Sequence, residues 1–142
     1  MIAIACPGQG SQKPGFMSSW LELPSYRKDI EMMSDVIGLD LIRHGTISDE
    51  DIIRNTEIAQ PLIVAASIAS ANLLDIKGAG AVVGHSVGEV AAGYVAGILN
   101  MEQAIQLVNL RGQAMSRAAK SSQETSMAAI LGGEQDEIVQ HL

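Results

Sequence analysis

The feature that most constrains this chain is a Gly-x-Ser-x-Gly motif that follows a short apolar run. Val82 and Val83 lead into Gly84, Ser86 stands at the centre of the motif, and Gly88 opens a stretch of small residues at helical spacing. This order predicts a strand, a sharp turn and a helix, which together hold a serine in strained backbone geometry at the carboxyl edge of a sheet. A side chain at either glycine would collide with the neighbouring strand or helix.

The start of the helix after this turn presents unpaired N–H groups and partial positive charge, which suit a developing oxyanion. Gly-x-Ser-x-Gly also occurs in ordinary loops that carry a surface serine. The apolar run before the motif and the slim helix after it favour a catalytic serine at position 86 over such a loop.

The apolar run at residues 2–6 predicts a buried strand, and a glycine-rich loop follows it. The loop itself, residues 7–15, allows the backbone to approach a ligand closely. It does not match a phosphate-binding loop, because Pro14 follows Lys13 where serine or threonine is needed. It does not match a dinucleotide fingerprint either, because Lys13 occupies the place of the third glycine.

Helical periodicity dominates the rest of the chain, and Pro61 is suited to the first turn of its helix. Ser48 and Asp51 resemble a capping box, and Asn100 with Gln103 makes a second cap. A polar stretch at 120–126 separates the last strand and helix from the rest. We expect helices over 24–37, 48–54, 60–74, 87–96, 100–119 and 134–142, and further strands near 81–84 and 127–131.

Arg111 lies within the predicted helix 100–119 and has apolar neighbours at helical spacing, such as Leu107 and Met115. An unpaired buried charge is very costly, so this guanidinium should have an anionic partner. Two interpretations stay open. Arg111 either reaches to solvent or to a nearby carboxylate, or it clamps the carboxylate of a substrate.

Charge and composition exclude several classes of protein. The net charge of −7 and the lack of a basic cluster argue against a nucleic-acid partner. No apolar run is long enough to cross a bilayer, and no signal peptide is evident, so we expect a cytoplasmic protein without a membrane partner. The lone Cys6 excludes an internal disulfide and is expected to be buried.

Three stretches then coincide: PGQGSQ at 7–12, GHSVGE at 84–89 and an Arg-Gly pair at 111–112, beside the Gln60-Pro61 pair. Together they resemble the malonyl-CoA:acyl-carrier-protein transacylases of fatty-acid synthesis over essentially the whole chain. The resemblance implies an α/β-hydrolase-like core with an incomplete parallel sheet in residues 1–122. It also implies that residues 123–142 contain the first strand and helix of a ferredoxin-like small subdomain.

The resemblance also implies a mechanism. Ser86 would attack the thioester of malonyl-CoA, and the phosphopantetheine thiol of acyl carrier protein would then collect the malonyl group. The backbone N–H groups of Gln9 and Val87 would form the oxyanion hole, and Arg111 would bind the malonyl carboxylate. No cofactor is implied, because the coenzyme A thioester is a substrate.

In this family a histidine from later in the chain activates the serine. His85 should point away from the Ser86 hydroxyl, so we expect it to form part of the pocket wall. We expect His44 to be solvated on a polar loop, and His141 does not match the position of the family's base. The resemblance therefore implies a chain truncated before its general base, with weak or no activity by itself.

Two alternatives stay open. A serine hydrolase of the α/β or patatin-like type shares the serine motif, but it should carry an HG- or GGG-type oxyanion loop instead of PGQGS and gives Arg111 no purpose. The other alternative is an inactive fragment or a binding module that retains contacts to coenzyme A or to the carrier protein.

Overall fold

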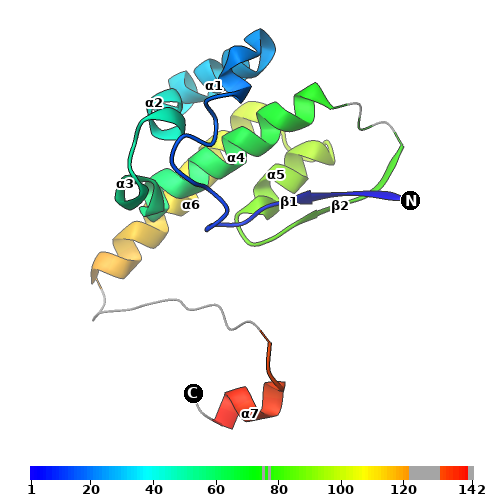
Figure 1. Cartoon of the computed structure of the whole chain (residues 1–142), viewed down its shortest axis with the longest axis vertical. Helices are drawn as coiled ribbons and strands as arrows, with labels where there is room; N and C mark the ends of the chain where they lie inside the picture. The colour runs from blue at the N-terminus through cyan, green and yellow to red at the C-terminus, as the bar shows by residue number, and fades with distance from the viewer. Residues whose placement is uncertain (75, 77, 122–131, 141–142) are drawn as a thin grey trace.

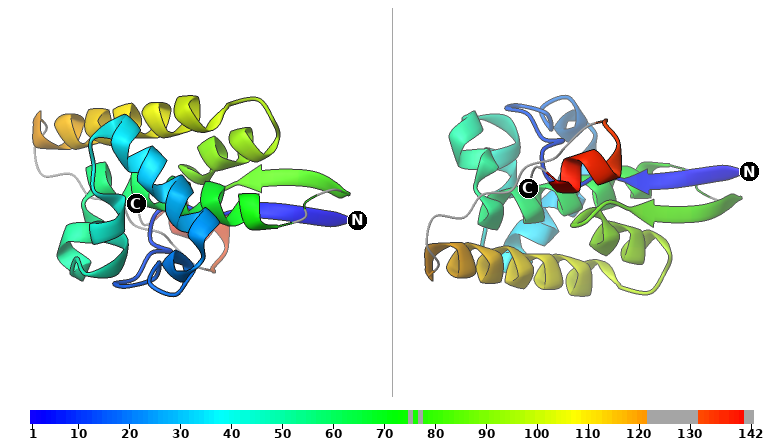
Figure 2. Two further views of the ribbon diagram at one scale, coloured as in Figure 1. Left: turned by 90° about the horizontal axis from the view of Figure 1, so that it is seen from above. Right: turned by 90° about the horizontal axis from the view of Figure 1, so that it is seen from below.

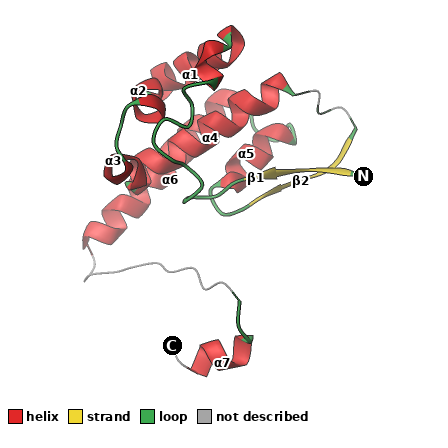
Figure 3. Ribbon diagram, in the orientation of Figure 1, coloured by secondary structure: helices red, strands yellow, loops and turns green. Residues whose placement is uncertain are grey.

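The computed structural model describes residues 1–74, 76, 78–121 and 132–140 and has the predicted α/β class. Figures 1 and 3 show two strands side by side at one edge of a largely helical body, with the last helix, α7, lying apart from it. The elements in chain order are β1 (Ile2–Cys6), the 3-10 turn η1 (Trp20–Glu22), α1 (Pro24–Ile37), α2 (Leu41–Thr46), α3 (Glu50–Arg54), α4 (Thr56–Leu73), β2 (Ala79–Gly84), α5 (Gly88–Val95), α6 (Met101–Ser121) and α7 (Gln135–Gln140).

The central element is α4, which packs against α1, α5 and α6 (Figures 1 and 2). Its side chains are small or aliphatic nearly all round, as an internal helix requires. Gly112 of α6 allows that helix to lie close to the first turn of α4. A Cβ at position 112 would lie only 3.1 Å from the Thr56 carbonyl oxygen. The buried residues of α4 are Ala59, Gln60, Pro61, Leu62, Ile63, Val64, Ala65, Ile68, Ala69 and Ala71.

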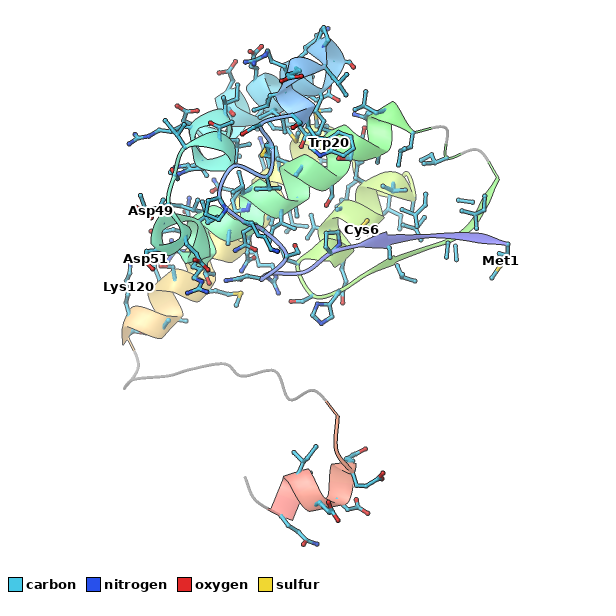
Figure 4. The ribbon with its side chains drawn as sticks, viewed as in Figure 1. Met1, Cys6, Trp20, Asp49, Asp51 and Lys120 are labelled. Atoms are coloured by element: carbon cyan, nitrogen blue, oxygen red, sulfur yellow. The ribbon has the colours of Figure 1, made fainter. Side chains whose placement is uncertain are left out.

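The two described strands run parallel, with Cys6 opposite Gly84 in the register. Cys6 is buried where β1 meets the helices, and Met1 marks the outer end of the strand (Figure 4). The predicted strand at 2–6 is confirmed as β1, and Cys6 is buried as expected, but the prediction that the whole strand is buried is wrong, because Ile2, Ala3 and Ala5 are exposed. In β2, Val83 is likewise 54% exposed. The cover from α5 is therefore confined to part of the described sheet.

Local sequence signals account for several helix ends. The predicted helix at 24–37 is confirmed as α1, in which Tyr26 and Met33 lie on the buried face, and Gly38 ends the helix with a φ of 65°. The predicted cap of α6 is confirmed, because Asn100 and Gln103 exchange hydrogen bonds of 2.8 and 3.0 Å between backbone N–H groups and side-chain oxygens. None of the described helices is long and apolar enough to cross a membrane.

Two predicted helix starts are wrong. The helix expected from Gln60 begins at Thr56, because Asn55 is available as an N-cap that accepts the Glu57 N–H at 3.3 Å. Pro61 therefore lies inside α4, where it removes the helical hydrogen bond to the Glu57 carbonyl.

The cap of α3 is Asp49, which accepts the Ile52 N–H at 2.9 Å, and not Ser48. Ser48 is buried and bonded to another side chain, so it is unavailable for capping. The predicted helix at 134–142 is confirmed over Gln135–Gln140. The predicted strand at 127–131, the boundary at 122–123 and His141 lie outside the described residues, so the second domain stays a prediction.

Candidate active site

The predicted strand, turn and helix around Ser86 are present, with β2 ending at Gly84 and α5 beginning at Gly88. Within the described part of the chain, Ser86 is the single non-glycine residue with a positive φ, 53°. Such a conformation costs about 1–2 kcal/mol, so the surroundings must impose it. Hydrogen bonds do so on both sides: the Gly88 N–H donates to the His85 carbonyl at 2.9 Å, and the Glu89 N–H donates to the Ser86 carbonyl at 3.0 Å. The turn leaves Ser86 exposed.

Both motif glycines are required by close backbone approach. A Cβ on Gly84 would lie 2.3 Å from the Glu89 nitrogen. A Cβ on Gly88 would lie 2.3 Å from the Cys6 carbonyl oxygen and 2.5 Å from that of Pro7. The collisions predicted from the sequence are thus confirmed, and Gly88 is where the serine turn packs on the end of β1.

The glycine-rich loop after β1 lies against the same turn. The His85 N–H donates to the Cys6 carbonyl at 3.1 Å. A Cβ on Gly8 would lie 2.3 Å from His85 Nδ1 and 2.8 Å from its carbonyl oxygen. His85 therefore packs over Gly8. This contact agrees with the expected wall position, although a role in substrate binding stays a prediction.

The two expected oxyanion donors flank this contact. Gln9 follows Gly8 directly, and Val87 follows Ser86 and caps α5. Among the described residues, neither the Gln9 N–H nor the Val87 N–H has a hydrogen-bond acceptor. Unpaired backbone donors beside a nucleophile are what an oxyanion hole requires. Their assignment to that role stays a proposal.

Two glutamine side chains, whose contacts no sequence pattern predicted, hold the loop in place. Gln12 accepts the Gly10 N–H at 2.9 Å and donates to the Ile53 carbonyl at 3.0 Å. The amide of Gln9 donates to Thr56 Oγ1 at 3.1 Å, which ties the loop to the first turn of α4. The PGQGSQ pattern is the sequence signal that could have indicated these positioning contacts.

Arg111 reaches the serine from α6. Its Nη2 lies 3.4 Å from Ser86 Oγ, and its Nη1 donates to Oε1 of Gln60 at 2.5 Å. No carboxylate of the described residues lies within ion-pair distance of this guanidinium, so an internal ion pair is not its partner there. The structure thus brings together Arg111 and Ser86, both predicted from the sequence, and adds Gln60, for which the sequence predicted only a place near a helix start.

The prediction that His44 is a solvated loop residue is wrong. His44 lies in α2, is half-buried, and its Nδ1 is 3.0 Å from Ser48 Oγ. Burial, helped by the charge of Arg43 and opposed by that of Asp40, lowers the pKa of the imidazole. Among the described residues, no histidine nitrogen is hydrogen-bonded to Ser86 Oγ.

The geometry combines an exposed hydroxyl in a strained turn, unpaired N–H groups and a guanidinium whose protein partner is neutral. This arrangement suits acyl transfer through a serine ester in which the acyl group carries an anionic end.

Comparisons with known proteins also indicate acyl transfer. Residues 4–140 match the family model described as acyl transferase domain. The chain is 41% identical to the malonyl CoA-acyl carrier protein transacylase of Mycobacterium tuberculosis strain H37Rv, in an alignment that covers 100% of this chain and 48% of that protein. The chain therefore spans about half the length of the curated relatives it matches.

Solved structures give the same result. The crystal structure of MCAT from Mycobacterium tuberculosis superposes with a TM-score of 0.91 at 41% identity, covering 99% of this chain and 48% of that one. The solved complex of a type II PKS acyl-carrier protein with its malonyl-transacylase matches with a TM-score of 0.76 at 36% identity. This match covers 82% of this chain and 39% of that chain. On its fold, its serine turn and a family match over nearly its full length, the chain belongs to the acyl transferase domain family.

Proposed function

We propose that this chain provides the acyl-carrying serine and the carboxylate-binding arginine of an enzyme that moves malonyl groups from coenzyme A to acyl carrier protein in fatty-acid synthesis. The observation that carries the proposal is the 3.4 Å approach of Arg111 Nη2 to Ser86 Oγ. A neutral acyl group would need a nucleophile and an oxyanion hole only, whereas this site adds a cation.

The reaction is a double displacement. Ser86 Oγ attacks the thioester carbonyl, the C–S bond breaks, and coenzyme A leaves as a thiol that takes up the serine proton. The phosphopantetheine thiol of the carrier protein then attacks the serine ester, and the hydroxyl is restored. The N–H groups of Gln9 and Val87 stabilise the oxyanion in both halves, and loss of one such donor typically costs about a hundredfold in rate.

The distance between the two side chains favours a short dicarboxylic acyl group. In a malonyl ester one methylene separates the ester carbonyl from the free carboxylate. A cation that already lies 3.4 Å from Oγ is placed for a carboxylate that close to the ester. A longer acyl chain would carry its carboxylate past the guanidinium.

The partners belong to the same proposal. Its support is the relatives' names, which specify malonyl CoA and acyl carrier protein, and the solved complex of a malonyl-transacylase with an acyl-carrier protein. A cytoplasmic location, expected from the sequence, is likewise proposed, and cell fractionation tests it.

Intact-mass measurement after incubation with malonyl-CoA tests the proposal. We expect a mass increase of one malonyl group that Ser86→Ala abolishes and the exposed control Ser25→Ala retains. Arg111→Leu should lose labelling by malonyl-CoA but keep labelling by acetyl-CoA, and Arg117→Leu, on the exposed side of the same helix, should change neither. Hydrolysis of malonyl-CoA without an adduct would favour a serine hydrolase, and an inert protein would favour a binding module.

Turnover is a separate expectation. Proton removal from Ser86 needs a base, and among the described residues no histidine nitrogen is hydrogen-bonded to Ser86 Oγ. A serine without a base retains only binding and electrostatic catalysis. We therefore expect the 142-residue chain to form the ester slowly and to transfer malonyl groups poorly in steady state. Turnover equal to that of an intact relative would contradict this.

A further inference from the structure

Gln60 is a polar side chain that the proposed reaction leaves without a role. It lies in α4, its exposed fraction is 0%, and both ends of its amide have partners. Oε1 accepts a hydrogen bond from Arg111 Nη1 at 2.5 Å, and Nε2 donates to Met115 Sδ at 3.1 Å. Both partners belong to α6, so the contact joins the two most closely packed helices of the described core.

We propose that Gln60 is a positioning residue that orients the Arg111 guanidinium toward Ser86 without neutralising its charge. This inference rests on the proposed function, since it explains how the carboxylate-binding group is prepared for its ligand. With Nη1 held by Gln60, Nη2 is the nitrogen directed at the nucleophile.

The side chain that holds Arg111 is a neutral amide and not a carboxylate. A carboxylate at position 60 would form a charge-assisted pair with the guanidinium and would compete with an anionic acyl group. The neutral amide oxygen accepts a hydrogen bond from Nη1 and leaves the positive charge of the guanidinium available to a ligand. No carboxylate of the described residues lies within ion-pair distance of Arg111, which agrees with this division of roles.

The contact with Met115 fixes which end of the amide faces the arginine. A thioether sulfur accepts hydrogen bonds weakly and donates none. The NH₂ group of Gln60 therefore turns to the sulfur, and the carbonyl oxygen turns to Arg111. With its oxygen directed at Arg111, the amide can hold Nη1 in place.

The spacing of the helices makes this contact possible. Gly112, next to Arg111, packs on the first turn of α4, and a Cβ there would lie 3.1 Å from the Thr56 carbonyl oxygen and 3.7 Å from Gln60 Cβ. A larger residue would push α6 away and lengthen the bond between the Gln60 and Arg111 side chains. The same turn of α4 holds Gln9 through Thr56, so it supports both the loop and the arginine.

Two variants of the full chain test the proposal, with Gln106→Met on the exposed face of α6 as the control. The measured quantity is the rate of ester formation at Ser86 with malonyl-CoA, divided by the rate with acetyl-CoA. We expect Gln60→Met to lower this ratio about tenfold, the effect of one ordered hydrogen bond to a charged group, while the acetyl rate stays within about twofold. Gln60→Glu, which keeps size and the acceptor, should also lower the ratio, because its carboxylate occupies the guanidinium. An unchanged ratio in both variants overturns the proposal.

A second readout separates this proposal from the function it rests on. In ¹⁵N NMR, restricted rotation should give Arg111 distinct Nη signals in the wild type, and Gln60→Met should merge them while Gln106→Met should not. If the wild-type chain forms no malonyl ester, the proposed function fails and the Nη signals alone decide the role of Gln60. Signals that Gln60→Met leaves unchanged would refute the positioning role. Should Gln60→Met not fold, Gln60→Glu still decides, because it should sharpen the Nη signals and lower the ratio.

Discussion

Replacing Gly88 by alanine tests whether the contact between β1 and the serine turn holds the active site together. The added Cβ would lie 2.3 Å from the Cys6 carbonyl oxygen and 2.5 Å from the Pro7 carbonyl oxygen. Ordinary contacts between carbon and oxygen begin near about 3.3 Å, so the backbone must separate by about 1 Å. Both colliding atoms belong to the main chain, and no side-chain rotation relieves them.

This geometry sets the expected magnitude. Overpacking a core costs about 1–3 kcal/mol, and a collision with two backbone atoms belongs at the upper end of that range. We therefore expect Gly88→Ala to lower the free energy of unfolding by about 3 kcal/mol, or the Tm by roughly 10 °C for a domain of this size. It should also slow ester formation at Ser86, because displacing the end of β1 moves the loop that carries Gln9.

Gly93→Ala provides the matched control, because it adds the same methyl group to the same helix. Its Cβ would lie 3.4 Å from Leu99 Cδ1, an ordinary contact. Alanine is the better helix former, so this variant should gain about 0.5–1 kcal/mol. Urea unfolding followed by circular dichroism measures both free energies. A Gly88→Ala protein as stable as the wild type, or a Gly93→Ala protein equally destabilised, would refute the reasoning.

Three further predictions concern the elements around the site. Gln12→Ala removes the two hydrogen bonds that the Gln12 side chain makes to Gly10 and Ile53. It should slow ester formation by about tenfold or more, because Gln9, the proposed oxyanion donor, would be misplaced, with little change in Tm; an unchanged rate would contradict it. Asn100→Ala should lower the free energy of unfolding by about 1 kcal/mol in urea, because α6 loses its N-cap, and a neutral result would show that the cap is not needed. Burial lowers the pKa of His44 in the folded protein from its ordinary value of 6.5, so the unfolded state binds the proton more readily. The stability that is present above pH 6.5 is therefore lost as the pH falls through the folded-state pKa of His44. Between about pH 7 and 5 the unfolding free energy of the wild type should therefore fall more steeply than that of His44→Gln, and parallel curves would exclude this contribution.

Much of the site could be predicted from the sequence because its determinants are local. The serine turn depends on a strand, two glycines and a helix within a few residues, and the structure contains it with Ser86 at a φ of 53°. The caps at Gly38 and Asn100 and the buried face of α1 are local in the same sense, since each involves residues within one or two turns.

Other features could not be read from short-range patterns. His44 was expected in solvent, yet α2 half-buries it against Ser48. The residues of β1 looked like a buried strand, yet most are exposed, because burial depends on what covers a strand and not on its own composition. The start of α4 was misplaced because Pro61 is a strong signal for a first turn, while Asn55 supplies a better cap earlier in the chain.

The sequence alone predicted a serine held in a sharp turn, a glycine-rich loop after the first strand and an arginine with apolar neighbours, because neighbouring residues encode each of them. Only the tertiary structure decided that Arg111 meets both Ser86 and Gln60, since these contacts join residues 25 and 51 positions apart. Such contacts depend on how closely two helices pack. That distance is set by the whole core, through the glycine at 112 and the slim face of α4, and not by any one stretch of chain.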